Sequence, residues 1–539
     1  MSIEELGLFK DSNNVNDSFK EFFEEYKKYY QEYKKAKENE QMENIKTLLI
    51  NNHNIILHGA PGTGKTYLAK DIAKQLIFGE YKNQLSGDEE KQFQEQCDFV
   101  QFHQSYDYTD FVEGLRPVNQ KGNQIGFERK NGVFKTFCNK ALLSDGLDNA
   151  YDTLIQKYRR KELTSFNQKT NTPIMIKDVD EQNNIVLQSE SEAKKDDPKN
   201  EYKITKEGIK KILEKYNTLE SLDKISNIKD EIRKCISPED SSAAWINSSG
   251  YWAVAKYLLE KINKKYIFII DEINRGEMSK IFGELFFSVD PGYRGKKGKI
   301  KTQYANLQEK PNEFDSALGI KQNVVKENGK DVDKNIDNYG HFFVPENVYI
   351  IGTMNDIDRS VESMDFAMRR RFAFKEVTAK QSKTMLDKPD SWKNGNGEKI
   401  DVSPCLENIK NRMDNLNNAI LNKEFNLGQA YQIGGAYFLK FANYCKTDDD
   451  KKAAESQDEA YKSLWENHLE GVLREYLRGM DNVEGEDGKL KKLEKAYNLD
   501  VKYKVDGMID TNAKNGNPPA EAKSGDGEEK QQQPEEMGT

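Results

Sequence analysis

The pattern of apolar and polar positions divides the first part of the chain into helical and strand-like segments. Residues 17–49 are rich in helix formers and carry aromatic residues at three- and four-residue spacing, which predicts one or two amphipathic helices. Residues 54–58 form a short apolar run that ends at a glycine, and 67–78 then have helical periodicity. This order predicts a buried strand, a glycine loop and a helix.

Further apolar runs continue the alternation of strands and helices. Residues 99–102 predict a strand and 132–143 a helix. Residues 265–270 are the most apolar run in the chain and predict a central strand of a parallel sheet, and 348–351 predict another buried strand. We therefore expect an α/β fold with a parallel sheet, followed by a helical lid domain because 405–477 read as helices throughout.

Polar segments interrupt this alternation. Two short strand-like runs and a helical segment (173–177, 185–188 and 205–216) lie within a region of changed composition and predict an inserted α+β module, and the polar region 295–340 predicts a second insertion. The last 28 residues have too little apolar surface to fold and are expected to be disordered. The expected organisation is an N-terminal helical segment at 1–43, an α/β nucleotide-binding domain at 44–148 and 251–380, the inserted module at 149–250, the lid at 381–511 and the tail at 512–539.

Composition narrows the class of protein. The chain has 539 residues and a net charge of -9, which opposes a large, permanently engaged nucleic-acid surface but allows a local basic groove or a DNA-binding partner. There is no run of about 18 apolar residues and no basic, apolar leader, so we expect a cytoplasmic protein without a membrane segment. The five cysteines form no C-x-x-C pair and the five histidines no H-E-x-x-H motif, so disulfide scaffolds and structural zinc sites are not expected.

A glycine-rich loop carries the strongest chemical signal. Residues 59–66 read GAPGTGKT, which fits G-x-x-x-x-G-K-[ST] between a predicted strand and a predicted helix. Backbone N–H groups of such a loop face phosphates, Lys65 supplies positive charge to the β- and γ-phosphates, and the Thr66 hydroxyl ligates Mg²⁺. A glycine turn without a ligand is the alternative. The expected nucleotide-binding residues are Gly59, Ala60, Pro61, Gly62, Thr63, Gly64, Lys65, Thr66, Tyr67 and Asp271.

Two carboxylates follow the most apolar strand. Asp271 would lie at the carboxyl end of that strand and hold Mg²⁺ with Thr66, and Glu272 would polarise water for attack on the γ-phosphate. Lys65 and Asp271 are 206 positions apart, whereas the two intervening βα units of a P-loop ATPase of the AAA+ type need only about 60 residues at ~30 per unit. The excess agrees with the inserted module.

Polar and basic residues follow the next strand. Asn355 and Asp358 are placed where a side chain could reach the γ-phosphate or the attacking water, although an ordinary turn, or the N-x-x-D pattern that reads guanine in small G proteins, would look similar. Three adjacent arginines could stabilise transition-state charge on the nucleotide of a neighbouring subunit, which would require a ring, or could form a solvated basic helix end. These arginines are Arg369, Arg370 and Arg371.

Four sequence blocks together resemble the AAA+ motor of the McrB family, the GTP-driven subunit of modification-dependent restriction systems. They are FVQFHQSYDYTDFVEGLRP at 99–117, IIDEINRGEMSKIFGEL at 269–285, VPENVYIIGTMNDIDRS at 344–360 and MDFAMRRRFAF at 364–374. The resemblance implies a hexameric ring with GTP between subunits, Asn355 and Asp358 placing the attacking water, and Arg359 acting across the interface with the 369–371 arginines. It also implies an McrC-like partner that carries the nuclease and contact with DNA through that complex. The preference for GTP over ATP rests on this resemblance alone.

The chain departs from the family pattern at three places. Asp356 adds a carboxylate where the family has N-T-A-D, and the lid has GGAYF at 434–438 where the family often has a G-H-S-Y-F block. About fifty helical residues stand where McrB carries a modified-cytosine-binding domain, and the module has few aromatic residues to stack a flipped base. The tail's Glu521-Ala-Lys523 lacks a preceding strand, so a nuclease in the same chain is not expected.

Two other functions stay open from the sequence. An ATP-dependent remodelling chaperone would share the same chemistry. A nucleotide-locked scaffold with little turnover would be compatible with the changes at Asp356 and in the lid.

Overall fold

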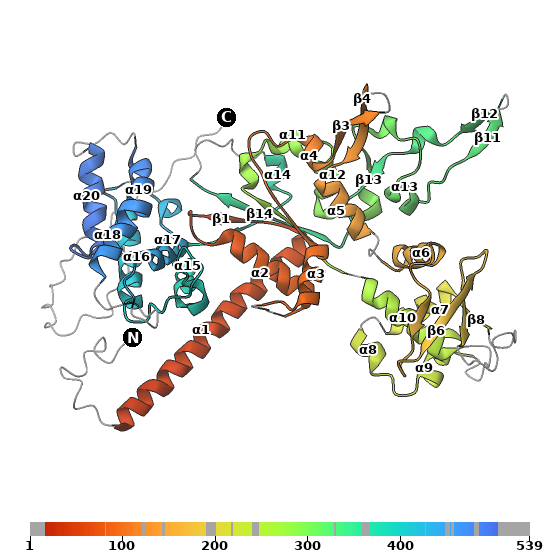
Figure 1. The fold of residues 1–539 in the computed structure, drawn as a ribbon, viewed down its shortest axis with the longest axis horizontal. Helices are drawn as coiled ribbons and strands as arrows, with labels where there is room; N and C mark the ends of the chain where they lie inside the picture. The colour runs from red at the N-terminus through yellow and green to blue at the C-terminus, as the bar shows by residue number, and fades with distance from the viewer. Residues whose placement is uncertain are drawn as a thin grey trace, which may run out of the picture.

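The computed structural model describes residues 17–80, 82, 84–120, 124–142, 146–189, 201–216, 219–239, 247–262, 264–327, 330–357, 366–425, 427–447, 453, 457–478 and 485–504. Figure 1 shows a central α/β body, with a helical domain on one side and a smaller α+β module on the other. The tail expected at 512–539 lies outside the described residues.

A five-stranded parallel sheet forms the middle of the body, in the order β15-β1-β14-β9-β2. Its strands are β1 (Asn54–Gly59), β2 (Cys97–Gln101), β9 (Tyr266–Asp271), β14 (Val348–Asn355) and β15 (Ala373–Glu376). The register pairs Gly59 with Asn355 and Gln101 with Asp271. The carboxyl ends of these strands therefore meet at one edge, where the predicted site residues lie.

Both faces of the sheet are covered, which is why its central strands read as continuous apolar runs. In β9, Ile267 and Ile269 pack in one hydrophobic cluster with α1 and α2, and Phe268 and Ile270 pack in another with α5 and α11. The helices of the body are α1 (Asp17–Asn52), α2 (Lys65–Phe78), α3 (Gly87–Gln96), α4 (Tyr108–Phe111), α5 (Val133–Leu142), α11 (Met278–Phe282), α12 (Leu285–Val289), α13 (Glu313–Ala317) and α14 (Phe366–Arg369).

The first helix is a single element of 36 residues that crosses the expected domain boundary at residue 43. Ile45 and Leu49 are buried against the sheet, whereas Tyr29 is 67% exposed. Figure 1 shows the first part of α1 extending away from the body.

Small antiparallel strand pairs extend from the body beside the sheet. They are β3 (Glu113–Gln120) with β4 (Gln124–Asn131), β10 (Ile300–Lys301) with β13 (His341–Phe342), and β11 (Val324–Glu327) with β12 (Lys330–Asp333). The β11–β12 pair and β10 lie in the expected second insertion at 295–340, and β13 follows it directly. The β3–β4 hairpin was not predicted, because its strands are mostly exposed and lack an apolar run.

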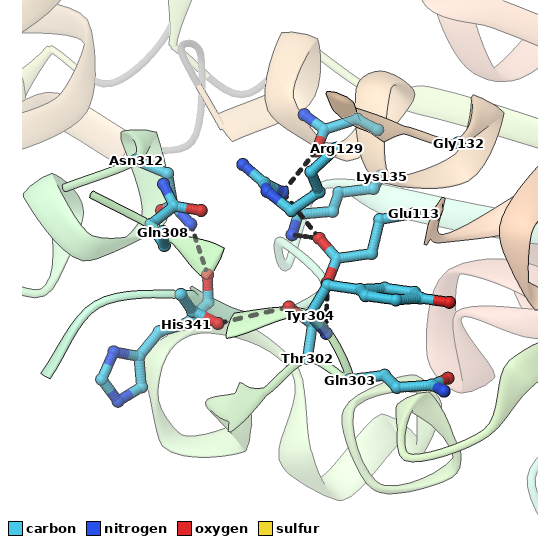
Figure 2. A network of polar contacts seen from close by, with 12 residues as sticks. Glu113, Arg129, Gly132, Lys135, Thr302, Gln303, Tyr304, Gln308, Asn312 and His341 are labelled. Atoms are coloured by element: carbon cyan, nitrogen blue, oxygen red, sulfur yellow. Dashed lines mark hydrogen bonds and ion pairs between the residues drawn. The ribbon is translucent and has the colours of Figure 1, made fainter. Parts of the chain in front are cut away.

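A buried charge cluster fixes the base of the β3–β4 hairpin (Figure 2). Glu113 Oε2 accepts hydrogen bonds from Lys135 Nζ at 2.6 Å and Arg129 Nη1 at 2.7 Å, and Oε1 accepts one from the Tyr304 N–H at 3.1 Å. Burial alone would raise the pKa of Glu113, but Lys135 and Arg129 together hold that pKa below its usual value. The cluster ties the hairpin to α5 and to the segment after β10.

The inserted module has its own hydrophobic core and an antiparallel sheet in the order β5-β6-β7-β8. The sequence predicted two of these four strands. The core includes Leu258 of the last helix, so the module's packing extends past the expected boundary at residue 250. The module's elements are α6 (Gly146–Arg159), β5 (Ser165–Asn167), β6 (Pro173–Val179), β7 (Ile185–Ser189), β8 (Glu201–Ile204), α7 (Lys206–Lys215), α8 (Leu219–Asp223), α9 (Ile228–Ile236) and α10 (Ser248–Lys261).

The C-terminal domain is helical, as expected. Its core runs from Ala379 to Tyr497 and includes buried Trp392 and Trp465. Its helices are α15 (Ala379–Ser382), α16 (Leu406–Ile420), α17 (Gly435–Leu439), α18 (Asp458–Leu464), α19 (Glu470–Leu477) and α20 (Gly485–Tyr497). The predicted α/β fold with a parallel sheet, an inserted α+β module and a helical lid is therefore confirmed. Among the described residues, none of the helices combines the length and apolarity needed to span a membrane.

Candidate active site

The glycine-rich loop joins β1 to α2 at the carboxyl edge of the sheet. Gly62 and Gly64 have φ values of 73° and 82°, in the left-handed region that glycine adopts readily, and α2 begins directly after them. Lys65 is buried, and its Nζ donates to the carbonyl oxygens of Gly59 at 3.0 Å and Ala60 at 2.8 Å. The lysine therefore lies across the inside of the loop, where phosphate oxygens could replace these carbonyl groups.

The surroundings of Lys65 are acidic but poorly hydrated. Burial lowers the pKa of Lys65 to about 8, although the carboxylates of Glu272, Asp356 and Asp271 act in the opposite direction. The Lys65 side chain is therefore mainly protonated at neutral pH. The negative charge of a bound polyphosphate would stabilise this protonated form further.

Asp271 ends β9 and faces the first turn of α2. The hydroxyl groups of Thr66 and Thr353 both donate to Asp271 Oδ1, each at 2.6 Å. A threonine hydroxyl and a carboxylate are the few hard oxygen ligands that Mg²⁺ takes from a protein when phosphates and water complete its shell. Thr66 and Asp271, which the sequence predicted as Mg²⁺ ligands, thus lie in contact and carry oxygen atoms of this kind.

Glu272 adopts a left-handed backbone conformation, with φ 51°, which is uncommon for a residue with a side chain and often marks active sites. Its Oε1 accepts a hydrogen bond from Asn355 Nδ2 at 2.5 Å, and Arg275 Nε lies 3.4 Å from Oε2. The side chains of Glu272 and Asn355, predicted separately as base and sensor, are therefore in direct contact next to the loop.

Two residues at the same edge were not predicted. Thr353 contacts Asp271 and also accepts a hydrogen bond from the Glu272 N–H at 3.2 Å. His58 Nδ1 lies 3.0 Å from a carboxylate oxygen of Asp356, the acidic residue that departs from the family pattern. Both positions immediately precede recognised motifs at strand ends, and strand order alone would have pointed to them.

The structure separates the three adjacent arginines. Arg369 and Arg370 are exposed, and Arg369 lies over the ring of Phe374 at 5.4 Å. Arg371 is 8% exposed, with its Nε 3.7 Å from Asp290 and its Nη1 donating to the Ala367 carbonyl. The Arg371 side chain is thus engaged within its own chain, while those of Arg369 and Arg370 are accessible. Asp358 and Arg359, the other two predicted site residues in this region, lie outside the described residues.

The lid touches the glycine-rich loop through its GGAYF block. Gly434 N–H donates to the Pro61 carbonyl, and Ala436 N–H to the Gly62 carbonyl, both at 3.0 Å. A Cβ at Gly434 would lie 2.1 Å from the Gly62 carbonyl carbon, and one at Gly435 would lie 2.6 Å from the Ser382 carbonyl oxygen. A histidine at position 435 would not fit this arrangement, which gives a physical reason for the departure from the family block.

The parallel sheet order, the loop with Lys65 and the paired carboxylates at one sheet edge define a P-loop nucleotide-binding protein of the AAA+ class. Residues 228–372 match the AAA domain of the dynein-related subfamily, and 408–484 match the alpha-helical lid domain of McrB. The first match begins within the inserted module, at the start of α9, and includes Asp271 and Glu272 but not the glycine-rich loop.

Curated relatives agree with these matches. The chain is 26% identical over 397 residues to the type IV methyl-directed restriction enzyme EcoKMcrB subunit of Escherichia coli, which is 74% of this chain and 50% of that protein. It is 26% identical over 139 residues to the type II restriction enzyme BsuMI component YdiS of Bacillus subtilis, 25% of this chain and 34% of the relative. The chain thus combines an AAA domain with an McrB-type helical lid domain and is similar to components of restriction systems, and it aligns with half or less of the length of these two relatives.

Proposed function

We propose that this chain is the Mg²⁺-dependent, GTP-hydrolysing motor of a DNA restriction system. In this proposal it forms a hexameric ring that drives a separate McrC-like nuclease subunit, with DNA bound through the complex in the cytoplasm. The observation that carries the hydrolytic part is the 2.5 Å contact between Glu272 and Asn355, at the sheet edge that also holds Lys65 and Asp271.

Each side chain has a distinct task in this proposal. Lys65 exchanges its two carbonyl partners for oxygens of the β- and γ-phosphates. Thr66 and Asp271 would hold Mg²⁺, which supplies charge neutralisation to the phosphates when it is bound.

Glu272 accepts the proton of the attacking water, and Asn355 fixes the direction of that carboxylate through its amide. The tight contact makes Asn355 a positioning residue for the base as well as a group that can approach the γ-phosphate.

Neighbouring subunits complete the site in this proposal. Arg369 and Arg370 are the exposed members of the basic block and have the accessibility that a residue acting in trans needs. Arg359 and Asp358 keep the roles that the family resemblance implies. Arg371, paired with Asp290, maintains the turn that presents its two neighbours.

The test is steady-state phosphate release by the full chain with Mg²⁺ and either GTP or ATP, with assembly followed by light scattering. We expect faster turnover of GTP, nucleotide-dependent oligomers, and loss of turnover in Lys65→Ala. Glu272→Gln should still bind nucleotide but hydrolyse it about 10²–10⁴-fold more slowly, the usual range for removing a general base. Glu277→Gln, an exposed carboxylate in the next turn, is the matched control and should behave as the unmodified protein.

Other outcomes would replace the proposal. A preference for ATP would favour the remodelling chaperone. An assembled ring that binds nucleotide but releases no phosphate, with or without Glu272→Gln, would favour the scaffold, for which the Asp356–His58 pair and the glycine-rich lid contact are the relevant structural departures.

A further inference from the structure

A cavity of about 690 Å³ opens beside the glycine-rich loop, between α1, α2 and the first turns of the lid. Thr63, Gly64 and Tyr67 of the loop and of α2 belong to its lining, so a nucleotide whose phosphates lie on the loop would place its sugar and base in this space. The apolar part of its lining could pack against the faces of a planar ring. This part consists of Met42, Ile45, Leu68, Val377 and Met385. The cavity is therefore the natural position of the nucleobase.

Among the described residues that line this cavity, Asp71 is the one carboxylate. Asp71 lies two turns after Gly64 on α2 and is 4% exposed. Its ion pair with Lys74 is long, at 3.7 Å between Nζ and Oδ1. On the following turn Gln75 donates to Glu43 of α1 at 2.7 Å, so that position serves the packing of the two helices while Asp71 faces the cavity.

The environment of Asp71 is costly for a carboxylate in the absence of a ligand. Burial raises the pKa of Asp71, and the nearby ammonium groups of Lys74 and Lys388 oppose this shift. A buried carboxylate whose ion pair is long gains from a ligand that donates hydrogen bonds to both of its oxygens. The same cavity contains Lys388, whose Nζ lies 5.6 Å from the centre of the Tyr67 ring.

Guanine and adenine differ in the hydrogen-bonding groups that would face Asp71 and Lys388. Guanine presents two adjacent donors, N1–H and the 2-amino group, next to the O6 acceptor, whereas adenine presents the N1 acceptor next to the 6-amino donor. An ionised carboxylate only accepts hydrogen bonds and an ammonium group only donates them. Asp71 would therefore bind the guanine edge with two bonds and would repel the N1 lone pair of adenine.

We propose that Asp71 is the residue that selects guanine, by accepting hydrogen bonds from N1–H and the 2-amino group, while Lys388 donates to O6. This inference rests on the proposed nucleotide site, and it assigns the base preference to particular side chains of this chain. It also assigns a purpose to the contact of α1 with the body, because α1 supplies one wall of the cavity through Met42 and Ile45.

The experiment measures equilibrium binding of four nucleotides to the full chain by calorimetry: GTP, inosine triphosphate, xanthosine triphosphate and ATP. Inosine lacks the 2-amino group, and xanthine carries an oxygen in its place. For the unmodified protein we expect the order GTP, inosine triphosphate, ATP. For Asp71→Asn we expect a loss of GTP affinity of about 10- to 100-fold, the range for one or two hydrogen bonds to a charged group, and a gain for xanthosine triphosphate.

Asp88→Asn makes the same chemical change at a side chain that is 99% exposed on α3, and it should leave all four affinities unchanged. The inference is overturned if Asp71→Asn keeps the GTP affinity of the unmodified protein, or if it weakens all four nucleotides equally. The experiment separates this inference from the proposed function. Selective GTP binding that depends on Asp71, without phosphate release, would contradict the proposed motor function and support the role of Asp71. GTP hydrolysis with a base preference that is unchanged in Asp71→Asn would support the proposed motor function and contradict the role of Asp71.

Discussion

Replacing Gly434 by alanine tests whether the contact between lid and glycine-rich loop matters for activity. The backbone of Gly434 has φ -77° and ψ 161°, which alanine adopts without strain, so the effect of the added methyl group is purely steric. That methyl carbon would lie 2.1 Å from the Gly62 carbonyl carbon and 2.3 Å from the Thr63 nitrogen. Ordinary carbon contacts begin near 3.5 Å, so the lid has to withdraw by about 1.4 Å.

A withdrawal of this size breaks the two hydrogen bonds that join the lid to the loop, from Gly434 N–H to Pro61 and from Ala436 N–H to Gly62. At about 0.5–1.5 kcal/mol each, their loss costs about 1–3 kcal/mol, or about 5- to 150-fold in an equilibrium between closed and open lid. We expect Gly434→Ala to reduce phosphate release at low nucleotide concentration by a factor in this range, with a smaller change in the melting temperature of the whole chain.

Gly428→Ala is the matched control, because it lies six residues earlier in the same lid and a methyl group there meets no atom within 4 Å. Equal phosphate release by the two variants, at low and at saturating nucleotide, would refute the reasoning. It would mean that the lid leaves the loop during turnover and that the observed contact has no part in nucleotide binding.

Two further predictions concern buried charges. Because the pKa of Lys65 is lowered to about 8, its charge is present at pH 7 and is lost as the pH rises through 8. The nucleotide affinity of the unmodified protein, measured by calorimetry, should therefore fall between pH 7 and 9, whereas the affinity of Lys65→Ala should not change over this range. Glu113→Gln should lower the free energy of unfolding by about 3–5 kcal/mol in denaturant titration, because it leaves Lys135 and Arg129 without their shared counter-charge. The pKa of Glu113 is lowered in the folded state, so its contribution to stability is complete above the pKa of the unfolded chain and is lost as the pH falls through the pKa of the folded one. The difference in the free energy of unfolding between Glu113→Gln and the unmodified protein should therefore narrow below about pH 4.5. A gap that stays constant down to pH 3 would contradict this assignment.

The sheet and the glycine-rich loop could be predicted from the sequence because both leave strong local signals. The strand β9 is a continuous apolar run with two carboxylates at its carboxyl end. The loop combines a fixed spacing of glycines with a strand before it and a helix after it. The β3–β4 hairpin left no such signal, because its strands are held by the buried cluster around Glu113 rather than by an apolar face. Ion pairs between residues distant in sequence have no periodicity to detect.

The site was predicted as separate residues, and their contacts came only with the structure. The sequence could place Glu272 and Asn355 at neighbouring strand ends, but the amide-to-carboxylate contact depends on the register of β9 and β14. Likewise, three adjacent arginines look equivalent in the sequence. The fold distinguishes them, because Arg371 faces Asp290 while its neighbours remain exposed.

The inserted module is joined through the chain to β9, the strand that ends at Asp271. Its helix α10 contributes Trp252 and Leu258 to the module's core, and the short segment 262–265 connects that helix to β9, which ends at Asp271. A load that tilts the module therefore pulls on the strand that sets the position of Asp271 and Glu272, without any contact with the nucleotide.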